Sequence, residues 1–142
     1  MPVLEQVLEK NPESVKLVFK HFPLSTHKFS RQASIAVVAA GRQGKFWEFH
    51  DLLFKNYNRL NEQKITEIAQ KLNLDMKKFD QDRKDPGIEA VINRDLAEGN
   101  LVGVRGTPTV FINGRLLRNR NLVGFQAMID EILKNEGTPK GP

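Results

Sequence analysis

Apolar residues recur at helical spacing through most of the chain and alternate with other residues in only two short segments. Residues 2–10 carry a short apolar stripe that predicts a helix, and Asn11-Pro12 would end it. In residues 14–22, Val15, Leu17 and Phe19 alternate with Lys16, Val18 and Lys20, and this alternation predicts a strand that Pro23 closes. The chain is therefore expected to begin with a helix followed by a strand.

Between about residues 25 and 101 the pattern predicts helices and no strand. The helix expected over residues 29–40 has Gly41 as its stop, and the next one, over 45–56, is rich in aromatic residues. Side chains suited to capping a helix N-terminus then open three further helices, at Asn61, Asp75 and Asp85.

The pattern changes after this helical stretch. Residues 109–112 are rich in β-forming residues and Asn113-Gly114 is a strong signal for a two-residue turn, so residues 115–117 are expected to form the second strand of a β-hairpin. A final helix is expected over residues 122–134, followed by a loose tail over 135–142. Because an isolated strand cannot satisfy its backbone, the early strand is expected to join the hairpin in one sheet, with residues 25–101 as a helical insertion.

Length and composition narrow the class of protein. A chain of 142 residues with 39% hydrophobic and 27% charged residues fits a single globular domain, expected over 1–142. The net charge of +5 is spread along the chain, and no nucleic-acid partner is expected. No apolar run approaches the length of a membrane span, so no membrane association is expected either. Cysteine is absent, which excludes thiolate chemistry and cysteine-bound metals within these residues.

One segment resembles a known family. Residues 103–114, with the sequence GVRGTPTVFING, resemble the thioredoxin-fold superfamily and, within it, the DsbA-like thiol-disulfide oxidoreductases. The segments KLVFKHFPL and AGRQGKFWEFHDLLF stand in the order found in that family. The resemblance covers nearly the whole chain and implies an α/β, α+β-like architecture: an incomplete DsbA-like thioredoxin fold with a helical insertion.

The chain departs from the family at its catalytic motif. DsbA-like enzymes carry Cys-x-x-Cys at the start of the helix before the KLVFKHF-like strand, and here that helix begins at Pro2 without a cysteine. The first strand and the start of the first helix are therefore expected to be missing. No catalytic residue can be assigned, and no cofactor is expected.

The resemblance implies a substrate-binding site at Gly106, Thr107 and Pro108. In the family, the residue before a cis-proline pairs its backbone with a substrate strand, so the implied partner is an extended peptide or protein. Composition alone would favour a trans Thr107-Pro108 bond, since only about 5–6% of X-Pro bonds in folded proteins are cis, but the resemblance implies that this bond is cis. A homodimer is expected to cover the strand edges that the missing strand would leave open.

The other candidate sites have weaker signals. The histidines, His21, His27 and His50, lack metal-binding spacing, and His50 sits in an aromatic stripe typical of a core. The acidic run that includes Asp80, Asp82, Asp85 and Glu89 lacks EF-hand spacing, and the basic edge Arg115, Arg118 and Arg120 lacks interleaved aromatics.

Two functions from different classes remain. The first is a truncated thiol-disulfide oxidoreductase; the second is a redox-inactive thioredoxin-like module that binds extended peptides or a partner protein. An upstream Cys-x-x-Cys would discriminate them, and whether the chain itself is an enzyme stays open. Without a signal peptide the chain as encoded is expected in the cytoplasm, and an upstream signal segment would place it outside.

Overall fold

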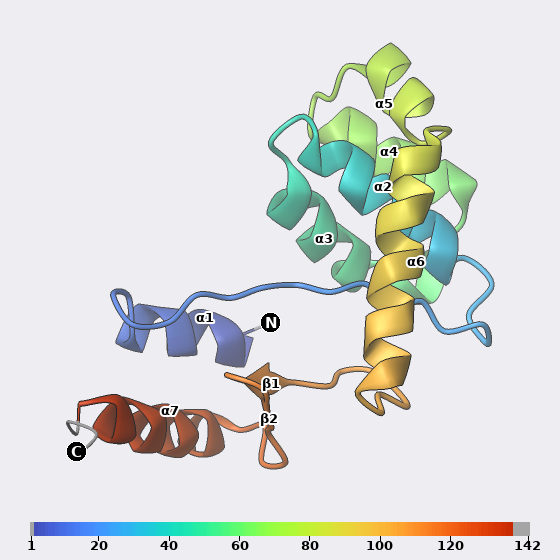
Figure 1. Cartoon of the computed structure of the whole chain (residues 1–142). Helices are drawn as coiled ribbons and strands as arrows, with labels where there is room; N and C mark the ends of the chain where they lie inside the picture. The colour runs from blue at the N-terminus through green and yellow to red at the C-terminus, as the bar shows by residue number, and fades with distance from the viewer. Residues whose placement is uncertain (1, 138–142) are drawn as a thin grey trace. The chain divides into compact units, whose positions relative to one another are not determined.

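The computed structural model describes residues 2–137. The chain forms two compact units, one built from residues 1–19 and 107–142 and the other from residues 20–106. We call the first the hairpin unit and the second the helical unit, and each is described by itself. Within residues 2–137 the structure contains seven α-helices and one small sheet, coloured along the chain in Figure 1.

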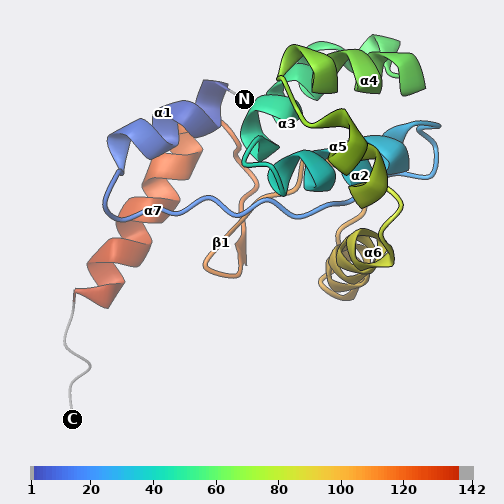
Figure 2. The same ribbon diagram turned by 90° about the horizontal axis from the view of Figure 1, so that it is seen from above.

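The helical unit contains every α-helix except the first and the last, together with one 3-10 turn. Helices α2 and α3 form an antiparallel pair joined by a short turn, and α6 is the longest helix of the unit (Figures 1 and 2). The elements are α2 (Ser30–Gly41), α3 (Phe46–Lys55), η1 (Tyr57–Arg59), α4 (Glu62–Lys71), α5 (Met76–Asp82) and α6 (Pro86–Leu101).

The core of the helical unit forms where the apolar stripes of its helices meet. Its largest fully buried side chains are Phe49, Phe79, Ile65, Ile88 and Ile92, which come from four different helices. The Phe49 and Phe79 ring centroids lie 5.8 Å apart. Small residues on α2 let the neighbouring helices approach closely, because Ala36, Ala39 and Ala40 are fully buried. This unit therefore closes its own apolar core.

The expected helix caps are confirmed in the helical unit. The Asn61 side chain accepts a hydrogen bond from the Lys64 N–H at 2.7 Å, and Asp75 accepts one from Lys78 at 3.1 Å. Asp85 accepts from the Gly87 N–H at 2.8 Å, with proline at the first helical position. These bonds satisfy backbone donors that a helix N-terminus leaves unpaired.

The hairpin unit contains α1 (Pro2–Lys10), β1 (Phe111–Ile112), β2 (Arg115–Leu116) and α7 (Leu122–Glu136). The strands pair antiparallel, with Phe111 opposite Leu116 and Ile112 opposite Arg115. Asn113 and Gly114 form the turn with φ values of 45° and 79°, the positive values that a two-residue hairpin turn requires. The predicted hairpin is therefore confirmed.

Helices α1 and α7 pack against each other within the hairpin unit, and they lie side by side in Figures 1 and 2. Buried amides reinforce this contact: the Asn11 Nδ2 donates to Gln126 Oε1 at 2.9 Å, and the Gln126 Nε2 donates to Asn11 Oδ1 at 3.1 Å. The core of this unit is small, and its fully buried members are Val7, Leu117, Phe125 and Ile129.

Two sequence expectations are wrong. Residues 14–22 contain no strand, because a strand is assigned from its hydrogen-bonded ladder and no neighbouring strand lies beside this segment within residues 2–137. The side chains still alternate, with Val15, Leu17 and Phe19 half-buried and the residues between them exposed. The tail expected from residue 135 is also corrected, since α7 continues to Glu136; residues 138–142 lie outside the described residues.

Candidate functional site

The loop that enters β1 carries the residues that the sequence singled out. Thr107 and Pro108 are exposed, and the peptide bond between them is cis. Within residues 2–137, the backbone N–H and C=O of Thr107 have no hydrogen-bond partner. Gly106 is half-buried and is the last residue of the helical unit, so the hairpin unit itself presents Thr107 and Pro108.

Arg120 contacts this loop from the other end of the hairpin. Its guanidinium Nη1 donates a hydrogen bond to the carbonyl oxygen of Pro108. Arg120 is exposed and follows β2, so the bond links the segment after the hairpin to the segment before it. The contact therefore fixes a positive charge beside Thr107 and Pro108.

One edge of the hairpin is open. Leu117 donates to the Val110 carbonyl at 2.9 Å, so residues 110 and 117 form a hydrogen-bonded pair. Because such pairs alternate along an antiparallel ladder, Phe111 and Leu116 form a pair without ladder bonds. The N–H and C=O of Phe111 consequently point away from β2, toward the free edge of β1.

The segment after α1 also has backbone groups without hydrogen-bond partners. In the part of the chain that the structure describes, the backbone groups of Lys16, Leu17 and Val18 have no hydrogen-bond partner. The alternating burial of this segment is that of a strand with one face on a core. Extended backbone with unpaired groups is a template for pairing with another strand.

Both unpaired segments line the same cavity of the hairpin unit. Its volume is about 170 Å³. The walls come from α1, the segment after α1, the β1 edge and α7, and their side chains are mainly apolar: Leu4, Val7, Leu8, Val15, Leu17, Val110, Ile112, Phe125, Ile129, Ile132 and Leu133. The cavity therefore combines apolar walls with two unpaired backbone segments.

An ionic cluster lies where the helical unit begins, with a buried carboxylate and two exposed basic side chains. Asp95 of α6 is 4% exposed, and its Oδ2 accepts a hydrogen bond from the His21 N–H at 3.0 Å. Lys20 Nζ and Arg94 Nη2 lie 3.7 and 3.5 Å from the other carboxylate oxygen. This arrangement binds the first residues of the unit to α6.

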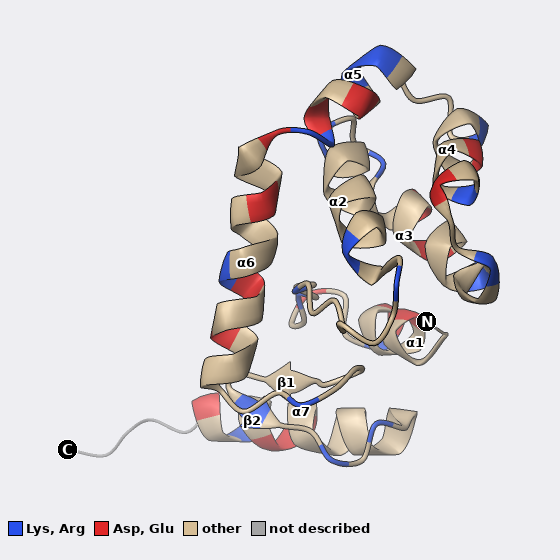
Figure 3. Ribbon diagram, turned by 90° about the vertical axis from the view of Figure 1, so that its right-hand side faces the viewer, with Lys and Arg blue, Asp and Glu red and all other residues tan. Residues whose placement is uncertain are grey.

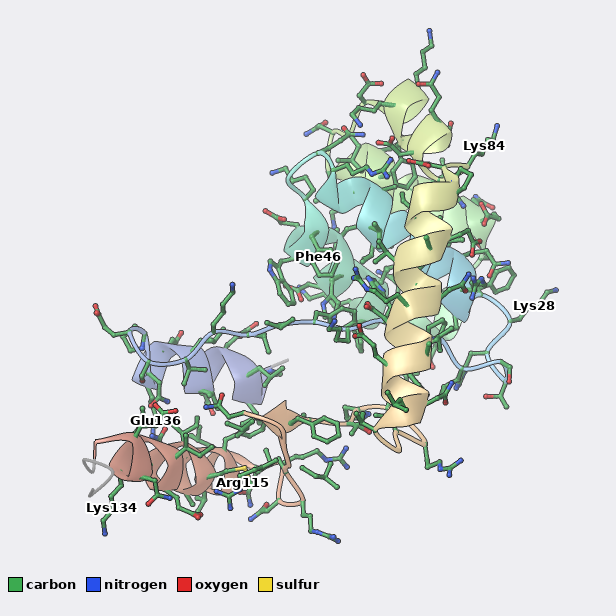
Figure 4. The ribbon with its side chains drawn as sticks, viewed as in Figure 1. Lys28, Phe46, Lys84, Arg115, Lys134 and Glu136 are labelled. Carbon is green, nitrogen blue, oxygen red and sulfur yellow. The ribbon has the colours of Figure 1, made fainter. Side chains whose placement is uncertain are left out.

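The imidazole of His50 is buried among aromatic rings of α3. The ring centroids of Phe46, Trp47 and Phe54 lie 6.2, 5.4 and 4.5 Å from that of His50. Figure 4 labels Phe46 on α3. The interpretation of this aromatic stripe as core is confirmed for His50 and Phe49, which are 5% and 0% exposed, and is wrong for Trp47 and Phe54, which are 44% and 53% exposed because they lie on the outer face of α3.

Burial lowers the pKa of His21 and of His50. For His21, desolvation lowers the pKa, and the nearby Asp95 carboxylate opposes this effect. For His50, desolvation likewise lowers the pKa, and Asp51, whose Oδ1 lies 3.3 Å from His50 Nδ1, raises it. Both imidazoles are therefore favoured in the neutral form.

Two residues of the acidic run, Asp82 and Asp85, pair with basic side chains. No group of three or more metal-ligating side chains occurs within residues 2–137. Asp82 is bonded to Arg42 at 3.0 Å, and Arg42 also pairs with Asp85 at 2.7 Å. The pKa of the Asp82 carboxyl lies below its ordinary value mainly because Lys78 donates a hydrogen bond to it, and the bond from Arg42 adds to this effect. The pKa of Asp85 is lowered mainly by the hydrogen bond from the Gly87 N–H, and again the bond from Arg42 adds to it. Helix α6 carries three acidic residues and one arginine, and charges of both signs occur in each unit (Figure 3).

Sequence reasoning did not identify the roles of Asp95 and Arg120. Asp95 has ordinary helical surroundings in sequence, and its partner His21 is 74 residues away, so no local signal marks it. Arg120 was considered only as part of a basic edge. A signal did exist for Arg120, because residues 99–129 contain arginine and no acidic residue.

Comparison with known proteins identifies the class. The family model for the DSBA-like thioredoxin domain matches residues 1–130. The chain is similar in structure to a thioredoxin-like oxidoreductase from Silicibacter pomeroyi, with a TM-score of 0.82 and 26% identity, over 94% of this chain and 77% of that one. The chain thus belongs to the DsbA-like thioredoxin domain family and has its α/β fold.

Curated relatives are much longer proteins. The chain is 38% identical over 103 residues to a protein of Salinispora tropica named "Na(+)/H(+) antiporter NhaA 3", a match that covers 72% of this chain and 16% of that protein. A protein of Herminiimonas arsenicoxydans, named "Na(+)/H(+) antiporter NhaA", is 33% identical over 106 residues, which is 75% of this chain and 17% of the relative. The chain thus spans about a sixth of the length of these relatives.

These relatives overturn the set of partners expected from sequence. That set comprised an extended peptide or protein and a second copy of the chain, with no membrane, and it is wrong because the relatives carry the names of membrane antiporters. The physical reason for the error is that hydropathy reports only on the residues of this chain, which correspond to a small part of each relative. Among residues 2–137, no helix has the length and apolar character needed to cross a bilayer.

Proposed function

We propose that the chain forms the substrate-facing part of a DsbA-type thiol-disulfide oxidoreductase whose cysteine pair comes from sequence outside these residues. Family membership and the likeness to a thioredoxin-like oxidoreductase support this class of activity. Thr107 and Pro108, with Gly106 before them, are the proposed substrate-binding residues.

The observation that carries the proposal is the cavity of the hairpin unit. It is bordered by the unpaired backbone of Lys16 and Leu17 on one side and by the β1 edge, where the N–H and C=O of Phe111 point away from β2, on the other. A strand placed between them would pair with both edges and cover the apolar walls. In the family, that strand leads into the helix that carries Cys-x-x-Cys, so the same additional segment would bring both the strand and the thiols.

The chemistry requires those thiols. In disulfide exchange a thiolate attacks a disulfide sulfur, forms a mixed disulfide and releases the other sulfur as a thiolate. The second cysteine then attacks the mixed disulfide, so that one disulfide breaks, another forms and two electrons pass between the partners. The chain has no cysteine, and its contribution would be to hold the reacting disulfide against Thr107.

The curated relatives favour a second candidate that concerns the setting of the domain. An identity of 38% over 72% of the chain supports a domain carried by a Na(+)/H(+) antiporter. In that setting the domain would be joined to membrane-spanning helices outside these residues. The two candidates predict very different polypeptide lengths.

The test is the intact mass and thiol content of the protein isolated from its native source, followed by a disulfide-reduction assay. A somewhat longer chain with two thiols and thiol-dependent turnover is the expected result. A protein several times longer and recovered from membranes would support the antiporter setting. A native protein without thiols, and without turnover, would overturn the oxidoreductase proposal and leave a redox-inactive thioredoxin-like module.

A further inference from the structure

The segment from Thr107 to Met128 has an unusual charge pattern. It contains Arg115, Arg118 and Arg120 and no aspartate or glutamate. The whole chain has 22 basic and 17 acidic residues, so an acid-free stretch that contains the proposed substrate loop departs from the average. The three arginines differ in what they contact.

Arg115 is neutralised within the hairpin unit. Its guanidinium donates to Glu131 of α7 at 3.1 Å, and Figure 4 labels it beside that helix. Arg118 and Arg120, by contrast, have no carboxylate partner in the described part of the chain. Both are exposed. Two uncompensated positive charges therefore follow β2.

Arg120 is held where the substrate would lie. One of its N–H groups binds the Pro108 carbonyl, which leaves the other donors of the guanidinium available. The planar group can bind a carboxylate through parallel hydrogen bonds while it stays attached to the loop. The exposed, unpaired backbone of Thr107 lies next to that anchor point in sequence.

Helix α7 adds to the positive potential of this region. It spans Leu122–Glu136 and begins directly after Asn121, whose side chain caps it by accepting from the Gly124 N–H at 2.8 Å. The N-terminus of a helix carries a partial positive charge. Arg118 and Arg120 immediately precede this terminus, so the two sources of positive potential act on the same region.

We propose that Arg120, assisted by Arg118, binds a carboxylate of the disulfide that reacts at Thr107 and Pro108, so that the site selects carboxylate-bearing disulfides over neutral ones. This inference rests on the proposed function for the location of the disulfide. The binding step itself requires no thiol, and it can be measured on the cysteine-free chain.

The test uses 3,3′-dithiodipropionate and its neutral diamide as probes. Amide NMR signals of Thr107 and Thr109 are followed during titration of the chain with each compound. We expect the dicarboxylate to bind about tenfold more tightly than the diamide, because it gains one charge-assisted hydrogen-bonded pair with the guanidinium. Its binding should weaken at high salt. Equal binding of the two probes, or shifts located elsewhere, would overturn the proposal.

Substitutions separate a specific contact from general charge. Arg120→Gln is expected to abolish the preference for the dicarboxylate, and Arg120→Lys to restore only part of it, because lysine keeps the charge but lacks the planar fork. The matched control, Arg115→Gln, removes the same charge from an arginine already paired with Glu131 and should leave the preference unchanged. An equal effect of both Gln variants would show a nonspecific field and contradict the role of Arg120.

Two further arms complete the design. Suberate has two carboxylates separated by the same number of atoms but no disulfide, and binding as tight as that of the disulfide would overturn the assignment to disulfides. In the native protein, exchange of both probes at equal rates would overturn this inference and leave the proposed function intact. Absence of any thiol-dependent exchange would overturn the proposed function, while the NMR result would still decide whether Arg120 binds the carboxylate.

Discussion

The two units of the chain satisfy their backbone and their apolar surface to different degrees. In the helical unit, backbone groups are paired within helices, the predicted caps are present, and large side chains such as Phe49 and Phe79 are fully buried. In the hairpin unit, the fully buried core has four members, and the backbone of Lys16–Val18 has no partner within residues 2–137. The difference lies in how the hydrogen bonds of each element are made.

Helices complete their hydrogen bonds within a single segment, whereas strands depend on a neighbour. A unit made of helices can therefore be complete in these residues while a unit built around strands is not. This difference supports our proposal that an added strand completes the hairpin unit, whereas the helical unit closes its own core within these residues.

Phe49→Ala should destabilise the helical unit most. The side chain is 0% exposed and contacts the Phe79 ring, and truncation of a buried phenylalanine costs about 3–5 kcal/mol. Urea unfolding followed by circular dichroism would measure the loss. The control on the same helix is Phe54→Ala, at a side chain 53% exposed, with an expected cost of about 1 kcal/mol or less. Similar losses in both variants would contradict a closed core.

Phe125→Ala should affect the hairpin unit and leave the helical unit protected. Phe125 is 5% exposed and belongs to the smaller core, and we expect a loss of about 3 kcal/mol. Amide hydrogen exchange would show faster exchange in α1 and α7, with unchanged protection in α2 and α6. Equal loss of protection in both units would show that they unfold together, against the division proposed here.

Removing one N-cap in each unit gives a smaller and matched comparison. Asn61→Ala and Asn121→Ala each delete one side-chain bond to the backbone at a helix start, and each should cost about 1 kcal/mol. Exchange of the amides of α4 and α7, respectively, would locate each effect. If Asn121→Ala has no effect on α7, the start of that helix is not held as described.

Acidification should weaken the helical unit selectively, because all three histidines lie in it. His21 and His50 have lowered pKa values in the folded state, so the unfolded state binds protons more readily. Their contribution is fully present above the ordinary value of 6.5 and is lost as the pH falls below it toward the lowered values. Unfolding of His50→Gln should depend less on pH over this window than unfolding of the parent. Identical pH profiles for the two proteins would contradict this assignment.

Local signals in the sequence predicted most of the fold. The caps at Asn61, Asp75 and Asp85 and the Asn113-Gly114 turn are determined within a few residues, and each is found as expected. The strand expected over 14–22 failed for a physical reason: its side chains alternate as predicted, but a ladder also needs a neighbour that the pattern cannot supply.

The site was less accessible to sequence reasoning than the fold. Thr107 and Pro108 were identified through a resemblance, and their role stays a prediction. The bond from Arg120 to Pro108 joins residues on either side of a hairpin, and the one from His21 to Asp95 spans the helical unit. Neither bond has a periodic signature, because each depends on how complete elements pack.

The most direct test of the account is amide hydrogen exchange at Lys16, Leu17, Val18 and Phe111, measured in this chain and in the protein isolated from its native source. We predict fast exchange at all four amides in this chain, because their N–H groups face no partner within residues 2–137. In the native protein an added strand would pair with Phe111 and with alternate residues of the other segment, either Leu17 or both Lys16 and Val18, and the amides so paired should be strongly protected. Strong protection in this chain, or fast exchange in both proteins, would contradict the claim that the hairpin unit is completed by a further strand.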